Sequence, residues 1–541
     1  MPLFLLACER PFGSRRTDAA NSRDPAPPGR GHIPEAGCRL RRRPRRTAPG
    51  GRGSLARLAS VSDTRQHYGL TLGILTLGTT AYALQQTMVV PALPELQREL
   101  DAPTTWVTWV LTGFLLSAAV LTPILGKLGD RFGKERLLVA SLLAFLVGCV
   151  ACAIAPNIWA LIAARIVSGA GGAVFPLSFG IIRDEFPADR VKVGIGLLSA
   201  VFGVGGGLGL VLSGVLIDNL SWRWIFVVGA AAVAVAVVLV HRFVPESPVR
   251  SQSRVDVPGA ILFSVMLIAL LLALSEGEGW GWTSPAVLGL FGLSLIAGVV
   301  WVLFELHVDE PLIDMRVLAD RPVLLTNTTA LISGFAMFGS FVLVPGFVQA
   351  PGDLPDAIAS HLGYGFGATA TTTGLYLLPG SLLMLFAGPL AGVFGRRVGS
   401  KWPLSIGMAL VMLGAGALAA LHDEPWQIIV AMACLSVGVG FSFAAMAALV
   451  TEAVRPTETG VATGINTVMR TVGGVMGAQI GAAILSADTL AGTAVPAESA
   501  YVSAFVLAAV AAGCGAVIAL FVTPTGIRRR RVAVAVGAAD A

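Results

Sequence analysis

Long apolar stretches, separated by short polar segments, run from Tyr68 almost to the end of the 541-residue chain. Each is close to the roughly 20 residues that a helix needs to cross the hydrocarbon core of a bilayer. The pattern predicts an all-α membrane protein with fourteen membrane-spanning helices. The predicted spans are residues 70–93, 104–126, 137–155, 158–182, 193–217, 224–243, 257–275, 285–305, 322–349, 371–394, 402–421, 426–450, 458–485 and 500–523.

Basic residues between the spans indicate which side of the membrane each loop faces. With the amino terminus inside, the outer loops carry only Arg98 and Arg223. Cytoplasmic loops carry an excess of Lys and Arg, so the distribution predicts fourteen spans with both termini in the cytoplasm. The inner basic residues are Lys127, Arg131, Lys134, Arg136, Arg183, Arg190, Lys192, Arg242, Arg250, Arg254, Arg316, Arg321, Arg396, Arg397, Lys401, Arg455 and Arg528 to Arg531.

The loop between spans 2 and 3 is repeated in the second half of the chain. Internal repeats of this kind build many transporters, and this one indicates an internally repeated membrane protein. The copies differ where Asp130 of the first corresponds to Arg396 of the second. Pro389, Gly392, Gly395, Arg397, Gly399 and Lys401 stand at the positions of Pro123, Gly126, Gly129, Arg131, Gly133 and Glu135.

Composition agrees with a membrane protein, because 55% of the residues are hydrophobic and 13% are charged. The predicted organisation is a disordered basic tail, six spans, a linker with two further spans, six more spans and a cytoplasmic tail. These parts are residues 1–66, 67–243, 244–321, 322–526 and 527–541. The net charge of +6 does not indicate nucleic-acid binding, because the basic residues lie where a membrane face is predicted.

With these motifs placed, the chain resembles the major facilitator superfamily, specifically its fourteen-span drug:proton antiporter branch, from about Tyr68 to Arg531. The segment from Gly126 to Lys134 is similar to the signature of the loop between spans 2 and 3. Further resemblances begin at Trp109 in span 2, Leu161 in span 4, Trp222 in span 6 and Gly460 in span 13. The motif in span 13 continues with Gly464, Arg470, Gly473 and Gly474.

The resemblance implies the superfamily's fold, two six-helix bundles with two inserted central spans. It also implies a secondary transporter of the bacterial inner membrane and not an enzyme. This transporter would export lipophilic or amphipathic drugs by alternating access, in exchange for protons. We expect a small-molecule substrate, protons and the lipid bilayer as partners, a monomer, and no cofactor, metal or nucleic acid.

The loop after span 2 supplies the predicted gating residues. A carboxylate at a helix junction can cap the positive end of a neighbouring helix and pair with basic residues. The resemblance implies that this holds the cytoplasmic side shut. The alternative is a loop whose positive charge only orients the protein. The candidates are Gly126, Asp130, Arg131, Gly133, Lys134 and Arg136.

Polar side chains inside the apolar spans are candidates for coupling or for the substrate cavity, because polar groups in a membrane need partners or water. They are Gln85, Gln86 and Thr87 in span 1, Arg165 in span 4 and Arg470 in span 13. Each can equally hold helices together. In span 5, Gly205, Gly209, Ser213 and Gly214 form a face of small residues that predicts close helix packing.

Two positions differ from the antiporter pattern. The branch commonly has an acid where span 1 has Gln85, and a proline where span 5 has Leu210. The carboxylate that binds the proton therefore stays open among Asp130, Glu305, Asp218, Glu276 and Glu278. The first alternative function is a facilitator or an exporter of one specific metabolite, without proton exchange.

Two further alternatives come from other classes. A membrane-embedded enzyme is disfavoured because the spans hold no cluster of catalytic or metal-ligating side chains. A receptor without transport activity is disfavoured by the two-fold repeat. Cys149 and Cys152 have metal-site spacing, but apolar residues surround them in the sequence, which favours buried thiols.

Overall fold

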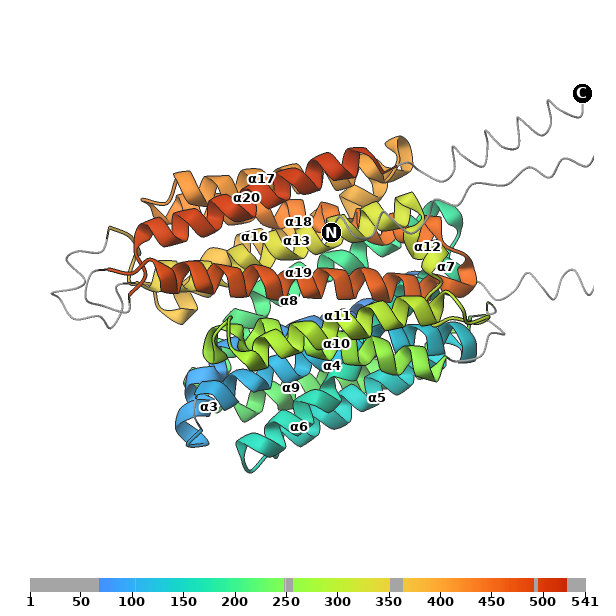
Figure 1. The fold of residues 1–541 in the computed structure, drawn as a ribbon, viewed down its shortest axis with the longest axis horizontal. Helices are drawn as coiled ribbons and strands as arrows, with labels where there is room; N and C mark the ends of the chain where they lie inside the picture. Colours follow the sequence, from blue (N-terminus) through green and yellow to red (C-terminus); the bar gives the residue numbers. More distant parts are fainter. Residues whose placement is uncertain are drawn as a thin grey trace, which may run out of the picture. The chain divides into compact units, whose positions relative to one another are not determined.

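The computed structural model describes residues 68–102, 104–247, 249, 256–350, 363–490 and 495–522. In this part the chain forms long α-helices that run side by side (Figure 1), and the pairing of Thr489 with Pro496 is an isolated bridge. The predicted tail of residues 1–66 and the tail of residues 527–541 lie outside the described residues.

Among the described residues, the first half of the chain supplies seven helices longer than ten residues. They are α2 (Tyr68–Thr87), α4 (Thr104–Phe132), α5 (Lys134–Ala153), α6 (Ile158–Ser168), α7 (Val174–Glu185), α8 (Ala188–Asn219) and α9 (Arg223–Phe243). The 3₁₀ turn η3 (Gly169–Ala173) joins α6 to α7, so that predicted span 4 is interrupted at its centre. The shorter elements η2 (Val90–Ala92) and α3 (Leu93–Glu99) follow α2.

Two helices and a short segment link this half to the second. They are α10 (Val257–Trp280), α11 (Pro285–Glu305) and α12 (Met315–Ala319). The second half contains α13 (Arg321–Phe341), α14 (Leu343–Gln349), α16 (Ala370–Val398), α17 (Lys401–Ala420), α18 (Pro425–Ala453), η4 (Pro456–Glu458), α19 (Thr459–Ala487) and α20 (Glu498–Leu520).

In the described part of the chain, twelve helical segments are long and apolar enough to cross a membrane. They include α6 with α7 as one segment and α13 with α14 as another. The first and fifth predicted spans are also helical, as α2 and α8, but neither is among the twelve. The count of fourteen spans and the cytoplasmic position of both termini therefore stay predictions.

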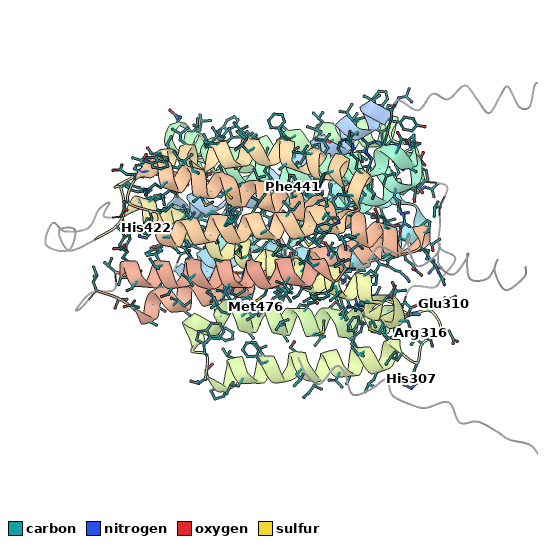
Figure 2. All side chains as sticks on the ribbon, turned by 90° about the horizontal axis from the view of Figure 1, so that it is seen from above. His307, Glu310, Arg316, His422, Phe441 and Met476 are labelled. Carbon is teal, nitrogen blue, oxygen red and sulfur yellow. The ribbon has the colours of Figure 1, made fainter. Side chains whose placement is uncertain are left out.

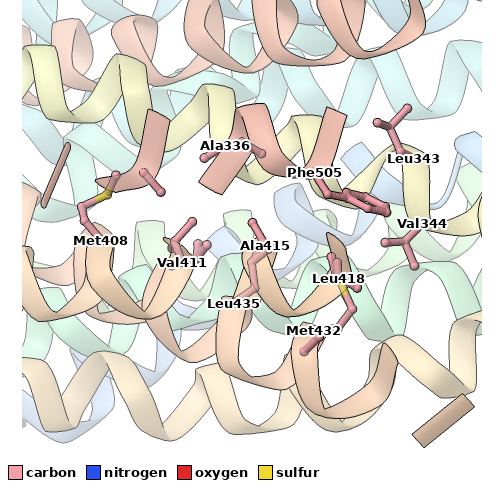
Figure 3. Close-up of a cluster of buried hydrophobic side chains, with 14 of the residues drawn as sticks. Ala336, Leu343, Val344, Met408, Val411, Ala415, Leu418, Met432, Leu435 and Phe505 are labelled. Carbon is pink, nitrogen blue, oxygen red and sulfur yellow. The ribbon is translucent and has the colours of Figure 1, made fainter. Parts of the chain in front are cut away.

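Each half packs around a core of its own. In the first half, Phe114, Phe145 and Phe175 are buried together. In the second half, Met408 of α17 and Phe505 of α20 belong to a large apolar cluster, which Figure 3 shows in close-up. We call α2 to α9 the N-terminal bundle and α13 to α20 the C-terminal bundle.

The two bundles meet where α8 packs on α16 and where α4 packs on α19. Glycines let the backbones approach: a Cβ at Gly196 of α8 would lie 2.4 Å from the carbonyl oxygen of Gly388 of α16. The extra helix α10 packs against both α4 and α19, and α11 packs on α10. The two extra helices therefore lie beside one of the seams between the bundles (Figure 1).

Candidate functional site

Asp130, near the end of α4, binds the first turn of α19 in the opposite bundle. Its carboxylate is fully buried and accepts hydrogen bonds from the backbone N–H groups of Gly460 and Val461, each at 3.1 Å. The first N–H groups of a helix have no partner within the helix and carry the positive end of its dipole. Asp130 therefore stabilises the contact between the bundles, and we call this contact the Asp130 latch.

Glycines bring the two backbones close enough for the latch. A Cβ at Gly126 would lie 2.5 Å from the carbonyl oxygen of Gly460, which is too close for any larger residue without movement. Gly133 joins α4 to α5 with φ of +117°, a conformation that L side chains rarely adopt. The local structure therefore explains why glycine stands at positions 126 and 133 of the predicted motif.

Lys134 lies fully buried between two acids. Its Nζ is 3.5 Å from Asp130, forms an ion pair with Asp184 at the end of α7, and donates to the carbonyl oxygen of Pro456 at 3.3 Å. A buried carboxylate next to a buried ammonium offsets part of the desolvation cost of both charges. Lys134 therefore also crosses between the bundles.

The other two predicted gating residues lie differently. Arg131 is half-buried and stacks on the ring of Phe132, with its guanidinium carbon 4.9 Å from the ring centroid. Arg136 is exposed, and its Nε is 3.4 Å from Glu246 of the same half of the chain. The contacts found for these two arginines do not cross to the C-terminal bundle.

Further contacts at this end were not predicted as a site. Arg183 of α7 donates to the carbonyl oxygen of Val454 at 2.7 Å and to the hydroxyl of Thr459 at 2.6 Å. Lys192 of α8 lies 2.7 Å from the carboxylate of Glu452 at the end of α18. The sequence pattern indicates only the side of the membrane for these basic residues, because their partners lie more than 250 residues away.

The repeated loop in the second half makes a different contact. Arg396, which replaces the acid of the first copy, donates to the backbone carbonyl of Asp189 at 2.9 Å. Gly392 approaches the first residues of α8, because a Cβ there would lie 2.5 Å from the carbonyl oxygen of Lys192. Both copies of the motif therefore touch the opposite bundle at the same end, and the acid of the first copy makes the helix-capping contact.

Two small cavities lie between the bundles at the level of Arg470. One has a volume of about 30 Å³ and the other about 10 Å³, so the larger has space for about one water molecule. The guanidinium of Arg470 stacks on Phe443, 4.2 Å from its centroid, and lines both cavities. Other lining residues are Tyr82, Gln86, Phe175, Phe338 and Asn466.

The three polar residues at the end of α2 point in different directions. Gln86 lines the larger cavity. Gln85 is fully buried against α9, where a Cβ at Gly229 would lie 2.2 Å from its Oε1. The hydroxyl of Thr87 donates to the carbonyl oxygen of Gly205 in α8. Of these three residues, Gln86 is the one that lines a cavity at Arg470.

Arg165 lies inside the N-terminal bundle and lines neither cavity. It is fully buried, its Nε donates to the carbonyl oxygen of Val110 at 3.1 Å, and its guanidinium is 4.0 Å from the ring centroid of Phe114. Its Nη1 and Nη2 atoms have no hydrogen-bond partner. A role for Arg165 in coupling stays a prediction.

The small residues of α8 pack against α2. A Cβ at Gly205 would lie 2.5 Å from the Cβ of Ala83, and one at Gly209 would lie 2.1 Å from the hydroxyl of Thr87. Ser213 donates to the carbonyl oxygen of Met88. Gly214 has more room, since its nearest neighbour is the hydroxyl of Thr371 at 3.7 Å. The packing face therefore consists of the first three positions.

Of the acids left open as proton carriers, Glu276 and Glu305 are both buried. The side chains of Asp218 and Glu278 lie outside the described residues. Cys149 and Cys152 are buried free thiols, and the described residues contain no group of three or more His, Cys, Asp or Glu that could hold a metal ion.

Family comparison agrees with this arrangement of two bundles. The family model of the Major Facilitator Superfamily matches residues 75–478 and 352–535. The chain belongs to this superfamily. It is therefore a multi-pass membrane transporter and not an enzyme, and small-molecule substrates bind within the membrane in this superfamily.

Several bacterial proteins are similar to the transporter. It is 30% identical to the uncharacterised MFS-type transporter YhcA of Bacillus subtilis, over 62% of this chain and 60% of that one. It is 27% identical to multidrug resistance protein 3 of B. subtilis, over 73% and 74% of the two chains. It is also 27% identical to the methylenomycin A resistance protein of Streptomyces coelicolor, over 73% and 81%.

A solved structure shows the same fold. The crystal structure of the human organic anion transporter MFSD10 (TETRAN) matches with a TM-score of 0.60 at 14% identity, over 84% of this chain and 99% of that one. At this identity the likeness concerns the fold alone.

Proposed function

We propose that this transporter exports lipophilic or amphipathic drugs across the bacterial inner membrane by alternating access, in exchange for protons. In this proposal the protein acts as a monomer and has fourteen spans with both termini in the cytoplasm. The drug specificity is supported by the names of two relatives, a multidrug resistance protein and a resistance protein for one antibiotic.

The observation that carries the mechanism is the Asp130 latch. Alternating access requires two bundles that separate at one membrane face while they meet at the other. At the predicted cytoplasmic end, Asp130 and Lys134 bind backbone groups near the start of α19, and Arg183 donates to the hydroxyl of Thr459 there. Between the bundles, the cavities at Arg470 are too small for a drug. These features fit a form with the cytoplasmic side shut.

The cavity chemistry fits amphipathic ligands. Aromatic rings of both bundles, Phe175 and Phe338, and the polar groups of Gln86 and Arg470 line the larger cavity. Binding sites for small molecules commonly combine apolar walls with a few polar groups. In this proposal the cavity enlarges when the latch opens and the bundles separate.

A transport assay tests the proposal. The purified protein is reconstituted in liposomes with a trapped pH dye, a pH gradient is imposed, and lipophilic cations such as ethidium are added. We expect ethidium to collapse the gradient, and protein-free liposomes and Asp130→Asn protein to leave it intact. Ethidium flux without proton movement would refute the exchange, and no flux of any tested cation would refute the drug specificity.

One observation favours the second candidate, a facilitator or an exporter of one specific metabolite without proton exchange. Gln85 replaces the acid of the antiporter pattern and is buried against α9, where an amide cannot carry a proton. The same assay separates the two candidates, because a facilitator moves its substrate without moving protons.

A further inference from the structure

Two acids lie side by side at one end of the extra helix pair. Asp256 immediately precedes α10 and Glu305 is the last residue of α11, and they are 7% and 3% exposed. A Cβ at Gly259 would lie 2.1 Å from Oδ2 of Asp256 and 2.8 Å from Oε1 of Glu305. Both carboxyl groups therefore approach the same point.

The partners of these two acids are neutral. Oδ1 of Asp256 accepts from the backbone N–H of Gly259 at 2.9 Å, which caps α10, and its Oδ2 has no partner. Glu305 accepts from the indole N–H of Trp301 at 2.9 Å and from the backbone N–H of Ile313 at 3.4 Å. No Lys, Arg or His forms an ion pair with either acid in the described part of the chain.

This geometry favours the binding of a proton. Two adjacent carboxylates that are removed from water repel each other, and a shared site of this kind keeps one group protonated. A compensating cation would relieve the repulsion, and the described residues provide none in contact. Oδ2 of Asp256, which has no hydrogen-bond partner, is the free acceptor of the pair.

We propose that Asp256 and Glu305 form a proton-binding pair that releases the exchanged proton on the cytoplasmic side. The inference rests on the proton exchange proposed above and names its site. The proton passes from the pair to water, and the charge that remains on the pair changes the position of the segment between α11 and α12.

A continuous set of contacts links the pair to the Asp130 latch. Glu305 binds the N–H of Ile313, and two residues earlier the carbonyl oxygen of Pro311 accepts from Nζ of Lys127 at 2.9 Å. Lys127 belongs to α4, one helical turn before Asp130. In addition, α10 packs on α4 and α19, the two helices that the latch joins. Ionisation of the pair would thus act on both sides of the seam.

Water can reach this region from the same end. A cavity of about 290 Å³ is lined by Leu312 and Ile313 of the segment that Glu305 binds, and it is large enough for several waters. Figure 2 shows His307, Glu310 and Arg316 at this end of the α10–α11 pair, with His422 at the opposite end of the molecule.

Other charged groups lie at this end of the molecule. On the segment after α11 they are His307, Asp309, Glu310 and Asp314, on α4 Lys127, and beside η4 Arg455 and Glu458. Asp309 and Glu310 are exposed, unlike the pair. Substitution of Asp309 is therefore a matched control that removes a neighbouring negative charge but leaves the pair intact.

Proton release on substrate binding tests the proposal. Ethidium is added to the purified full-length protein in weakly buffered solution, and proton release is followed with a pH dye. We expect wild type and Asp309→Asn to release protons, and Glu305→Gln to release at least about tenfold less. Asp256→Asn, which keeps the helix cap, is expected to release fewer protons than wild type. Ethidium binding by each variant, measured by fluorescence, shows that the protein is folded.

The outcomes separate the two proposals. Wild-type-like release by Glu305→Gln would overturn the pair as the proton site and leave drug:proton exchange standing. No release by a wild-type protein that binds ethidium would overturn the exchange, and with it the transport role of the pair. Infrared spectra give an independent check. The C=O stretch of the pair's protonated carboxyl group must disappear in Glu305→Gln. Persistence of this band would overturn the proposal that the pair shares a proton.

Discussion

The carboxylate of Asp130 accepts the backbone N–H of Gly460, 330 residues later in the chain, at 3.1 Å. This bond and its neighbour to Val461 place a negative charge at the positive end of α19. Because each residue belongs to a different bundle, the bond exists only when the bundles meet at this end.

Asparagine at position 130 should weaken the latch without changing the shape of the side chain. Only one of its two polar atoms can accept a hydrogen bond, and the charge that favours the helix end is lost. We expect Asp130→Asn to reduce ethidium efflux from cells at least about tenfold, with an unchanged amount of protein in the membrane. Efflux equal to wild type at equal protein level would show that the latch is not required.

Alanine at Gly126 should force the bundles apart at the same place. Its Cβ would lie 2.5 Å from the carbonyl oxygen of Gly460, and backbone cannot yield as a flexible side chain does. We expect Gly126→Ala to increase the labelling rate of a cysteine placed at Thr463, which is buried at the start of α19. Gly416→Ala is the control, because no atom lies within 4 Å of the added Cβ.

The two buried arginines should respond differently to lysine. Lysine keeps the charge but loses the planar group that stacks on an aromatic ring. For Arg470→Lys we expect ethidium transport per folded molecule to fall about tenfold, since Arg470 lines both cavities. For Arg165→Lys, which removes the contacts to Val110 and Phe114, we expect a lower melting temperature in detergent and a smaller effect on transport. The reverse pattern would contradict this assignment.

The packing face of α8 predicts a contrast between two glycines. Gly205→Val would press against Ala83 and should destabilise the protein by about 1–3 kcal/mol or more. Gly214→Ala has its nearest neighbour at 3.7 Å and should be close to neutral. Thermal unfolding in detergent, followed by tryptophan fluorescence, measures both. Equal melting temperatures for the two variants would show that the α2–α8 contact is not tight.

The apolar pattern of the sequence was sufficient to place the helices but not their interruptions. Predicted span 4 divides into α6 and α7 at Gly169–Ala173, and predicted span 9 divides into α13 and α14 at Val342. Both segments stay apolar through the break, so hydrophobicity alone gives no signal. The break in span 4 coincides with close packing, since a Cβ at Gly171 would lie 2.9 Å from Phe145.

The candidate site was predictable only in part, for geometric reasons. Asp130 stood out because an acid among glycines and basic residues is unusual, but its partner Gly460 is distant in sequence and binds through the backbone, which carries no side-chain signal. Gln85 and Gln86 are about 100° apart around a helix, so only one can face a given cavity. Which one does so depends on how α2 packs on α8 and α9.

The most direct test of the latch is a distance between the bundles. Phe132 and Arg455 are exposed and lie on opposite sides of the seam. Spin labels at these two positions report the distance between the bundles at the predicted cytoplasmic end, measured by pulsed electron resonance in lipid nanodiscs. We predict a mostly short distance in the otherwise wild-type protein and in the Asp309→Asn control, and a shift to longer distances in Asp130→Asn. An unchanged distribution in Asp130→Asn would contradict the claim that Asp130 holds the bundles together.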